Sequence, residues 1–366
     1  MSDSTLVLRI CGGLGICSPL VVSFFLTSGI ALAHQQLGDY PLCEGSAALQ
    51  MSCPGSEAPC LLVGDNEQQD KLFVFPMGRE GHLQVLNQRE LDLGRQSISD
   101  IEALTPGAAG KILLFGSHSR NTRCEDKDKR RRFASIRISG AGVTDVQIVE
   151  SKKIKCQRLF DDHVLTDPVL QAVCSAIDSA EDQAKTVAQQ LEDGTITEEA
   201  ATARCNEITP FNAEGAVAIP MAASPDFWIG LRAPLLAQHP HHPDYAQLAL
   251  LLHMKDLTAY RFRGAAFLDL GGRGVRELAF LGGEVWVIAG PAADQAEPFQ
   301  LWRFAARMLS HGAIINPTLV ATLPASAEGL VVTDKVAYVI IDGDADKDNE
   351  RCLRATSYQV IELSAR

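Results

Sequence analysis

Five glutamates stand at comparable positions in five similar segments of the chain. Each glutamate precedes an apolar run, and a cluster of polar residues follows the next apolar run. Carboxyl groups that recur in this way can bind a cation or transfer protons, and neighbouring arginines can bind an anion. The glutamates are Glu44, Glu102, Glu214, Glu277 and Glu328. The polar clusters contain Asp65, Asn66, His118, Arg120, Arg232, Asp342 and Asp344.

The apolar runs have the length and spacing of short β-strands. About four runs per repeat, at a period of roughly 50–60 residues, are typical of a propeller blade. We predict an all-β propeller with five visible blades, or six if an insertion conceals a degenerate one. The predicted strands are residues 46–51, 61–63, 72–75 and 82–86; 101–104, 112–115, 133–138 and 145–149; 216–219, 227–231, 248–253 and 265–268; 278–280, 285–288, 300–304 and 319–321; and 330–332, 337–341 and 357–361.

The fifth repeat is one strand short, and we expect residues 37–42 to supply that strand. Such a pairing would close the ring and protect its edge strands. In an antiparallel hairpin, the start of one strand lies beside the end of its partner. The first strands of the blades line the channel of a propeller, so the glutamates and polar clusters are predicted to converge on one face.

Many carboxylates on one face repel one another unless their charge is compensated. Calcium could compensate it, because it binds carboxylate oxygens. Arginines could do so through internal ion pairs, or could bind an anionic ligand; alternatively, each glutamate caps backbone amides in its own blade. The candidate calcium ligands are Glu44, Asp65, Glu102, Glu214, Glu328, Asp342 and Asp344. The arginines are Arg120, Arg232, Arg273 and Arg276.

Residues 160–206 interrupt the repeats. Apolar residues at a spacing of three to four over 169–192, and a second segment at 197–206, predict a helical hairpin. Cys174 and Cys205 could tie its two helices together. The sequence leaves open whether this insertion is decoration or a lid.

The N-terminal segment is typical of a signal peptide. Arg9 precedes an apolar stretch that ends in Ala31-Leu32-Ala33, with small residues at the −3 and −1 positions. We therefore predict a signal peptide at 1–33, a single mature domain at 34–366, and a periplasmic or secreted protein. An uncleaved membrane anchor is the alternative, because the stretch is near spanning length.

Cysteine usage agrees with export. Eight cysteines follow residue 33, and an even number in an exported chain suggests disulfides. Cys53 and Cys60 bracket C-P-G-S-E-A-P-C, a turn between two predicted strands, where a bridge would join a hairpin.

The composition argues against a nucleic-acid partner. The formal net charge is −12, and phosphate binding needs clustered lysine and arginine. With 46% hydrophobic residues the chain can bury a sizeable core. We expect a monomer that has no membrane span after signal cleavage and that binds a small anionic ligand or a protein.

Several of these segments together resemble a bacterial family catalogued as domain of unknown function 3616. They are C-E-G-S-A-A-L with L-L-V-G-D-N-E, D-I-E-A-L with G-S-H-S-R, N-A-E-G with I-G-L-R-A-P, L-D-L-G-G-R-G-V-R-E-L, and A-E-G-L. The resemblance implies a β-propeller related to exported phytase-like and esterase-like propellers, without implying a reaction. The helical insertion and its cysteines depart from it.

The sequence contains no G-x-S-x-G, no glycine-rich phosphate loop and no H-E-x-x-H. Two functional hypotheses remain, and whether the chain is an enzyme is open between them. The first is a calcium-assisted hydrolase of phosphorylated or other anionic esters, in which the metal and Arg120, Arg232 and Arg273 hold the anion. The second is a non-catalytic periplasmic propeller that binds a ligand or protein on its polar face.

Overall fold

The computed structural model describes residues 7–11, 17–21, 34–78, 82–161, 166–222, 224–295 and 297–363. The chain divides into two units, Met1–Ala33 and His34–Arg366. In the first unit, β1 (Val7–Cys11) and β2 (Cys17–Val21) form an antiparallel hairpin. The boundary between the units falls where we predict signal cleavage. The signal peptide itself stays a prediction, and much of it lies outside the described residues.

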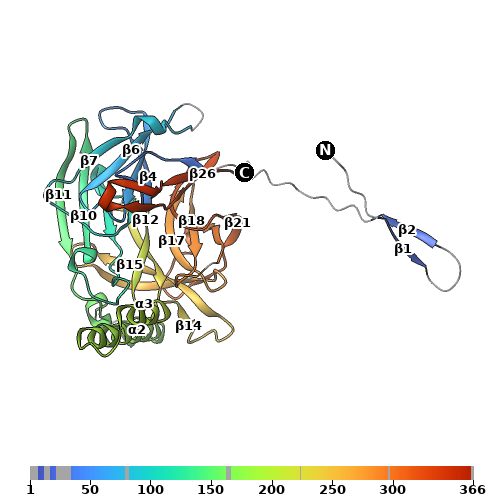
Figure 1. The fold of residues 1–366 in the computed structure, drawn as a ribbon. Coiled ribbons are helices and arrows are strands. Elements are labelled where there is room, and N and C mark those ends of the chain that lie inside the picture. Colours follow the sequence, from blue (N-terminus) through green and yellow to red (C-terminus); the bar gives the residue numbers. More distant parts are fainter. Residues whose placement is uncertain are drawn as a thin grey trace. The chain divides into compact units, whose positions relative to one another are not determined.

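The second unit is built from five sheets (Figure 1), each of which begins with an inner strand and is antiparallel except where β20 pairs parallel to β16 in the third. The first contains β4 (Gly45–Ser52), β5 (Pro59–Asp65), β6 (Lys71–Pro76) and β7 (Arg89–Asp92). The second contains β8 (Ile101–Pro106), β9 (Ile112–Gly116), β10 (Arg132–Ser139) and β11 (Gly142–Glu150). The third contains β12 (Asn212–Ile219), β13 (Asp226–Ala233), β15 (Ala246–Asp256) and β16 (Arg261–Leu268), with β14 (Leu236–Gln238) and β20 (Ile314–Ile315) added.

The last two sheets follow the same plan. The fourth contains β17 (Gly274–Leu281), β18 (Glu284–Gly290), β19 (Phe299–Ala305) and β21 (Thr318–Leu323). The fifth contains β22 (Ala327–Val332), β23 (Val336–Ile341), β26 (Ser357–Glu362) and β3 (Gln35–Gln36), and a small hairpin, β24 (Asp344–Asp346) and β25 (Arg351–Arg354), precedes β26.

The ring closes through the segment that precedes the first blade. β3 pairs with β26, and Leu37 N donates a hydrogen bond to Thr356 O at 2.8 Å. The inner strands β4, β8, β12, β17 and β22 each contact the next around the ring, and β22 contacts β4. The propeller fold and the closure of the ring by the segment that precedes the first blade are confirmed, but the strand is Gln35–Gln36 and not residues 37–42, which form a turn segment. The described residues form five blades, and the insertion between the second and third is helical.

A second predicted strand was also wrong. Residues 82–86 were expected to be the outer strand of the first blade, but Leu83 forms only an isolated bridge with Met77, and Val85–Asn87 is a 3-10 turn. The outer strand is β7, whose sequence R-E-L-D buries only Leu91. An edge strand needs few buried residues and tolerates charge, so its apolar signal is weak.

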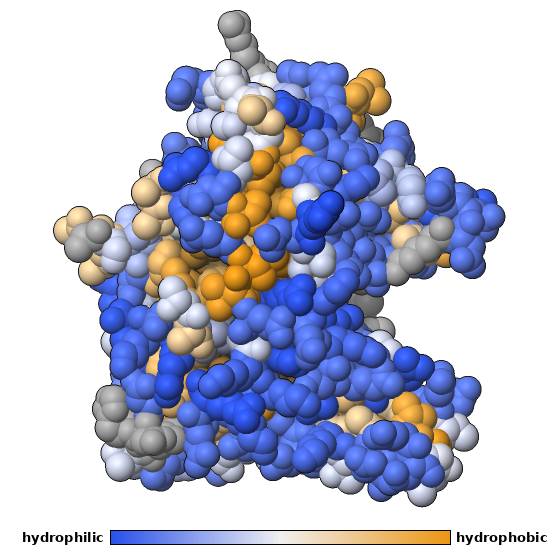
Figure 2. Space-filling model, turned by 90° about the vertical axis from the view of Figure 1, so that its left-hand side faces the viewer, coloured by the Kyte–Doolittle hydropathy of each residue, from blue (hydrophilic) through white to orange (hydrophobic). Residues whose placement is uncertain are grey.

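Apolar side chains fill the spaces between adjacent blades. Leu62 and Val74 of the first blade pack in one cluster with Leu114 and Ile136 of the second. On one face of the molecule, hydrophobic residues form a band within a mainly hydrophilic surface (Figure 2).

The insertion contains a short helix, α1 (Cys156–Leu159), and the predicted hairpin of α2 (Pro168–Glu192) and α3 (Glu198–Ile208). Asp167 caps α2 by accepting hydrogen bonds from two amides of its first turn, and Pro168 occupies a favoured first position. Thr197 caps α3. Within the described residues, no helix is both long and apolar enough to cross a membrane.

Four disulfides link the described part of the chain. The predicted Cys53–Cys60 bridge is confirmed. The predicted Cys174–Cys205 bridge was wrong, because Cys174 pairs with Cys156 and Cys205 with Cys124. α3 is much shorter than α2, so Cys205 packs beside Ala184, which lies ~15 Å along the helix from Cys174.

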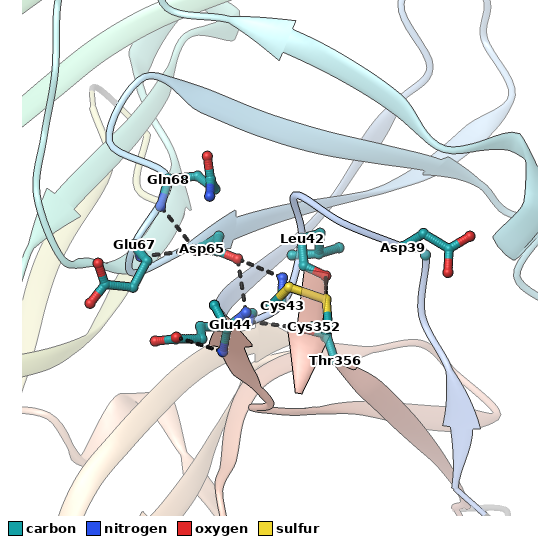
Figure 3. The surroundings of a disulfide bond; sticks show 12 residues. Asp39, Leu42, Cys43, Glu44, Asp65, Glu67, Gln68, Cys352 and Thr356 are labelled. Atoms are coloured by element: carbon teal, nitrogen blue, oxygen red, sulfur yellow. Dashed lines mark hydrogen bonds between the residues drawn. A yellow bond between two sulfur atoms is a disulfide. The ribbon is translucent and has the colours of Figure 1, made fainter. Parts of the chain in front are cut away.

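The fourth disulfide, Cys43–Cys352, joins the segment before β4 to the small hairpin before β26 (Figure 3). It connects residues at opposite ends of the second unit, at the place where the ring closes. The four disulfides are consistent with an exported protein.

Candidate functional site

A β-bulge occurs at the same place in every inner strand. The register shifts between Gly45 and Ala47, and at the equivalent positions of the other four blades. A bulge leaves one residue without a partner and re-aims its side chain. The residues at the bulges are Ser46, Glu102, Glu214, Arg276 and Glu328.

Three of the five predicted glutamates therefore occupy equivalent positions, and two do not. Ser46 stands in the first blade where Glu44 was expected, and Arg276 stands in the fourth where Glu277 was expected. Glu44 lies before β4, and its carboxylate accepts a hydrogen bond from Ala345 N at 3.1 Å. The residues at all five bulges lie at a similar distance before the apolar run of their strand. Comparing that distance between the repeats could have identified Ser46 and Arg276.

Glu277 is fully buried one residue beyond the bulge. Its Oε1 accepts a hydrogen bond from Leu278 N at 2.8 Å. Burial raises the pKa of Glu277 well above its usual range, against the effect of the amides of Leu278 and Ala48. Backbone amides thus hold the side chain of Glu277. This agrees, for this glutamate, with the alternative from the sequence that the glutamates cap backbone amides.

An ion-pair network joins the third, fourth and fifth blades. Arg276 Nη1 lies 3.0 Å from Glu214 Oε2 and 2.9 Å from Glu328 Oε1. Arg232 Nη1 lies 3.2 Å from Glu214 Oε1, and its Nη2 lies 2.6 Å from Asp294 Oδ1. Arg276 also stacks over the ring of Phe299 at 5.0 Å. The arginines thus compensate the clustered carboxylates through internal ion pairs.

Close packing of the inner strands brings these side chains together. A Cβ added to Gly215, which follows Glu214, would lie 2.9 Å from both Val275 Cγ1 and Leu278 Cγ of the next blade. Only a residue without a side chain permits that approach.

Glu102 differs from the other bulge glutamates because no cation pairs with it. Its side chain is buried, and within the described part of the chain its carboxyl group has no hydrogen-bond partner. Burial raises the pKa of Glu102 well above its usual range, and Asp100 and Glu214 raise it further. The protonated form of Glu102 is therefore favoured over that of an ordinary glutamate.

Two further carboxyl groups face the same space. Burial raises the pKa of Glu328 to about 7, although Arg276 opposes this shift. Burial also raises the pKa of Asp342 well above its usual range, with Glu328 as the next cause. The site thus contains three acids whose pKa values are all raised by burial.

These groups line a cavity of about 730 Å³ at the channel mouth, the central cavity. A smaller side cavity of about 280 Å³ adjoins it. Both are lined by Asn66, Glu102, Glu214, Arg232 and Asp294. The central volume is within the range of small-ligand sites.

Other predicted site residues have local structural partners. Asp65 accepts hydrogen bonds from four backbone amides, those of Cys43, Glu44, Glu67 and Gln68 (Figure 3). Its carboxylate therefore fixes the loop after β5 against the segment before β4.

Arg120 lines the side cavity and pairs with Glu181 of α2 at 2.9 Å. Arg273 Nη2 lies 3.7 Å from Glu297 Oε2. His118 is buried and stacks on Tyr260 at 3.8 Å, and burial lowers its pKa to about 3. Asp344 is exposed at the start of β24.

Among the described residues, no group of three or more His, Cys, Asp or Glu is arranged to hold a metal ion. Calcium binding at this face stays a prediction.

The fold and this site define a five-bladed β-propeller with a charged channel mouth. The model of a family described as "Protein of unknown function (DUF3616)" matches residues 211–335, which confirms the family resemblance over the third and fourth blades and the start of the fifth. No curated protein matches the sequence.

Several solved structures are similar at low identity. The GH43_1 enzyme from Xanthomonas citri complexed with xylotriose has 8% identity and a TM-score of 0.37, covering 88% of this chain and 87% of that chain. The GH43 endo-arabinanase from Bacillus licheniformis has 8% identity and a TM-score of 0.41, covering 90% of this chain and 96% of that chain. The Bacteroides ovatus Xyloglucan PUL GH43B has 8% identity and a TM-score of 0.41, covering 91% of this chain and 54% of that chain. The five-blade architecture itself rests on the strand pairing described above.

Proposed function

We propose that the channel mouth is the active site of an acid–base hydrolase that cleaves glycosidic linkages in a neutral substrate. The observation that carries this proposal is the pair Glu102 and Glu328 on one cavity. Glu102 has a strongly raised pKa and no cation partner, whereas the pKa of Glu328 is about 7.

Hydrolysis of an acetal requires an acid that protonates the leaving oxygen and a carboxylate that assists attack by water. Glu102 supplies the proton, because burial and its acidic neighbours raise its pKa and so favour the protonated form. Glu328 acts as the base that takes a proton from the attacking water, because a pKa close to the working pH is the most effective for that role. Glu214, paired with two arginines, supplies fixed negative charge beside the oxocarbenium-like transition state.

The ion pairs favour a neutral substrate over an anionic ester. Arg232 and Arg276 are largely buried and already bound to carboxylates. A phosphorylated ligand would have to displace those carboxylates while passing other acids of the same cavity. A hydroxyl-rich ligand instead donates hydrogen bonds to the carboxylates and accepts them from protonated acids.

A non-catalytic binding protein is the second candidate. The observation that favours it is that Arg276 bridges inner strands of three blades, a bracing role that requires no reaction. In that case the same cavity would bind a neutral ligand without turnover.

The test is turnover by residues 34–366 on a panel of neutral oligosaccharides and polysaccharides, with phosphomonoesters and carboxyl esters alongside. The variants are Glu102→Gln and Glu328→Gln, and the matched control is Glu57→Gln, which lines a separate apolar cavity. We expect glycoside hydrolysis that falls by about 100-fold or more in the first two variants and is unchanged in the third. Binding without turnover would favour the second candidate, and turnover of phosphomonoesters alone would overturn the proposal.

A further inference from the structure

The central and side cavities are not isolated at the channel mouth. A third cavity of about 610 Å³ shares part of its wall with the central cavity, formed by Pro291, Gln295 and Glu297. On its far side it is bounded by Ser179 and Gln183 of α2, and we call it the helix-side cavity.

A fourth cavity of about 440 Å³ shares no lining residue with the helix-side cavity. It shares Asn66, Asp100 and Arg130 with the side cavity, and its far wall is the segment 126–130 before β10. The four cavities therefore form one row that crosses the channel mouth between the helical insertion and this segment. The central and helix-side cavities each have the volume of a complete small-ligand site.

We propose that this row is a binding groove for a linear neutral oligosaccharide, and that the insertion forms its far subsite. This inference rests on the proposed function, because it places the scissile linkage at Glu102. It assigns a role to the insertion that neither a decoration nor a lid would have.

The chemistry of the far wall fits such a ligand. Ser179 and Gln183 on α2 and Gln295 opposite them present hydroxyl and amide groups that both donate and accept hydrogen bonds. Uncharged groups of this kind match the hydroxyls of a sugar.

The insertion is fixed in place as a wall of the groove. A disulfide connects α3 to Cys124 outside the insertion, and another connects α2 to α1 within it. Glu181 of α2 binds Arg120 at 2.9 Å, and Asn206 of α3 accepts a hydrogen bond from Asp294 N at 2.7 Å. Asp294 also pairs with Arg232, so the insertion is tied directly to the site at the channel mouth.

The experiment measures binding by calorimetry for neutral oligosaccharide series from dimers to hexamers, using Glu102→Gln as the parent so that turnover does not consume the ligand. The double variant Ser179→Ala/Gln183→Ala is made in that parent. Its matched control is Thr186→Ala/Gln189→Ala, which removes a hydroxyl and an amide from exposed positions of the same helix outside the cavity.

Affinity is expected to rise with chain length in at least one series. The Ser179/Gln183 variant should weaken binding of the longest oligomer about fivefold to tenfold, as expected for one or two lost hydrogen bonds, and leave the dimer unchanged. The control should match the parent throughout.

The outcomes separate the two proposals. Length-dependent binding in a protein that hydrolyses nothing would support the groove and refute the proposed hydrolysis. Turnover with affinity independent of length, or an equal effect of the Ser179/Gln183 variant on short and long ligands, would overturn the groove alone. No binding of any oligosaccharide would overturn the groove as well.

Discussion

Replacing Arg276 with methionine tests the ion-pair network at the channel mouth. Arg276 Nη1 lies 3.0 Å from Glu214 Oε2 and 2.9 Å from Glu328 Oε1, and its side chain is only 7% exposed. Because the side chain is buried, salt and solvent screen these pairs little. Methionine preserves much of the volume but leaves two carboxyl groups without this cation. Breaking a buried pair in this way costs about 3–5 kcal/mol of unfolding free energy.

The control is Lys71→Met. Lys71 Nζ lies 2.7 Å from Glu90 Oε2, a comparable distance, but the two side chains are 34% and 42% exposed. An exposed pair contributes less than about 1 kcal/mol, so burial and not distance should decide the difference between the variants.

The assay is urea unfolding at pH 7.5, followed by fluorescence of the buried residues Trp228 and Trp286. Adding Glu214→Gln and Glu328→Gln to Arg276→Met should recover most of the loss, because no unpaired carboxylate then remains. Equal losses for Arg276→Met and Lys71→Met, or no recovery in the triple variant, would refute the reasoning.

Three further predictions concern pH, the disulfide at the closure and calcium. Burial raises the pKa of Glu277 above its usual range and that of Glu328 to about 7, so the folded state holds these protons more tightly; the stability that these two groups contribute should be fully present below about pH 4.5 and be lost as the pH rises, for Glu328 through about 7. Glu277→Gln should flatten that fall in urea unfolding measured from pH 4 to 8, whereas an unchanged slope would contradict this account. Removing the Cys43–Cys352 bridge, which spans 309 residues, by a double serine substitution should lower the unfolding free energy by about 2–5 kcal/mol, and a loss below about 1 kcal/mol would show that the ring closes without it. If calcium binds the acidic face, millimolar calcium should raise the Tm of the wild type and not of Glu328→Gln; no shift in the wild type would count against the calcium site.

The blades could be predicted from the sequence because buried strands give strong apolar runs. β8, β13 and β18 each bury most of their residues, and all three lie where alternation and turn residues place them. β7 was missed because an edge strand that buries only Leu91 leaves almost no such signal.

The site could be predicted only in part. The repeated glutamate signal correctly brought Glu102, Glu214 and Glu328 together, since each is the unpaired residue at the bulge near the start of its inner strand. Glu44 and Glu277 were misplaced because a bulge shifts the register by one residue, which changes the direction of every neighbouring side chain. In the first blade the residue at the bulge is Ser46, so the nearby Glu44 does not mark that position.

The disulfide partners of the cysteines in the insertion depend on the lengths of the helices and on how they pack. The spacing of the cysteines in the sequence gives no information about either. Cys53 and Cys60 were predictable because a hairpin joins them locally. Cys205 bonds Cys124, a residue far away in the chain, because α3 packs against the loop that holds Cys124.

The central claim is that Glu102 donates a proton to the leaving oxygen. The most direct test compares Glu102→Gln with the wild type on two glycosides of one sugar that differ only in their leaving group, a nitrophenol and a simple alcohol. A nitrophenolate leaves without protonation, so the variant should retain most of its activity on the aryl glycoside and lose about 100-fold or more on the alkyl glycoside. Equal losses on both substrates, or full activity on the alkyl glycoside, would contradict the account.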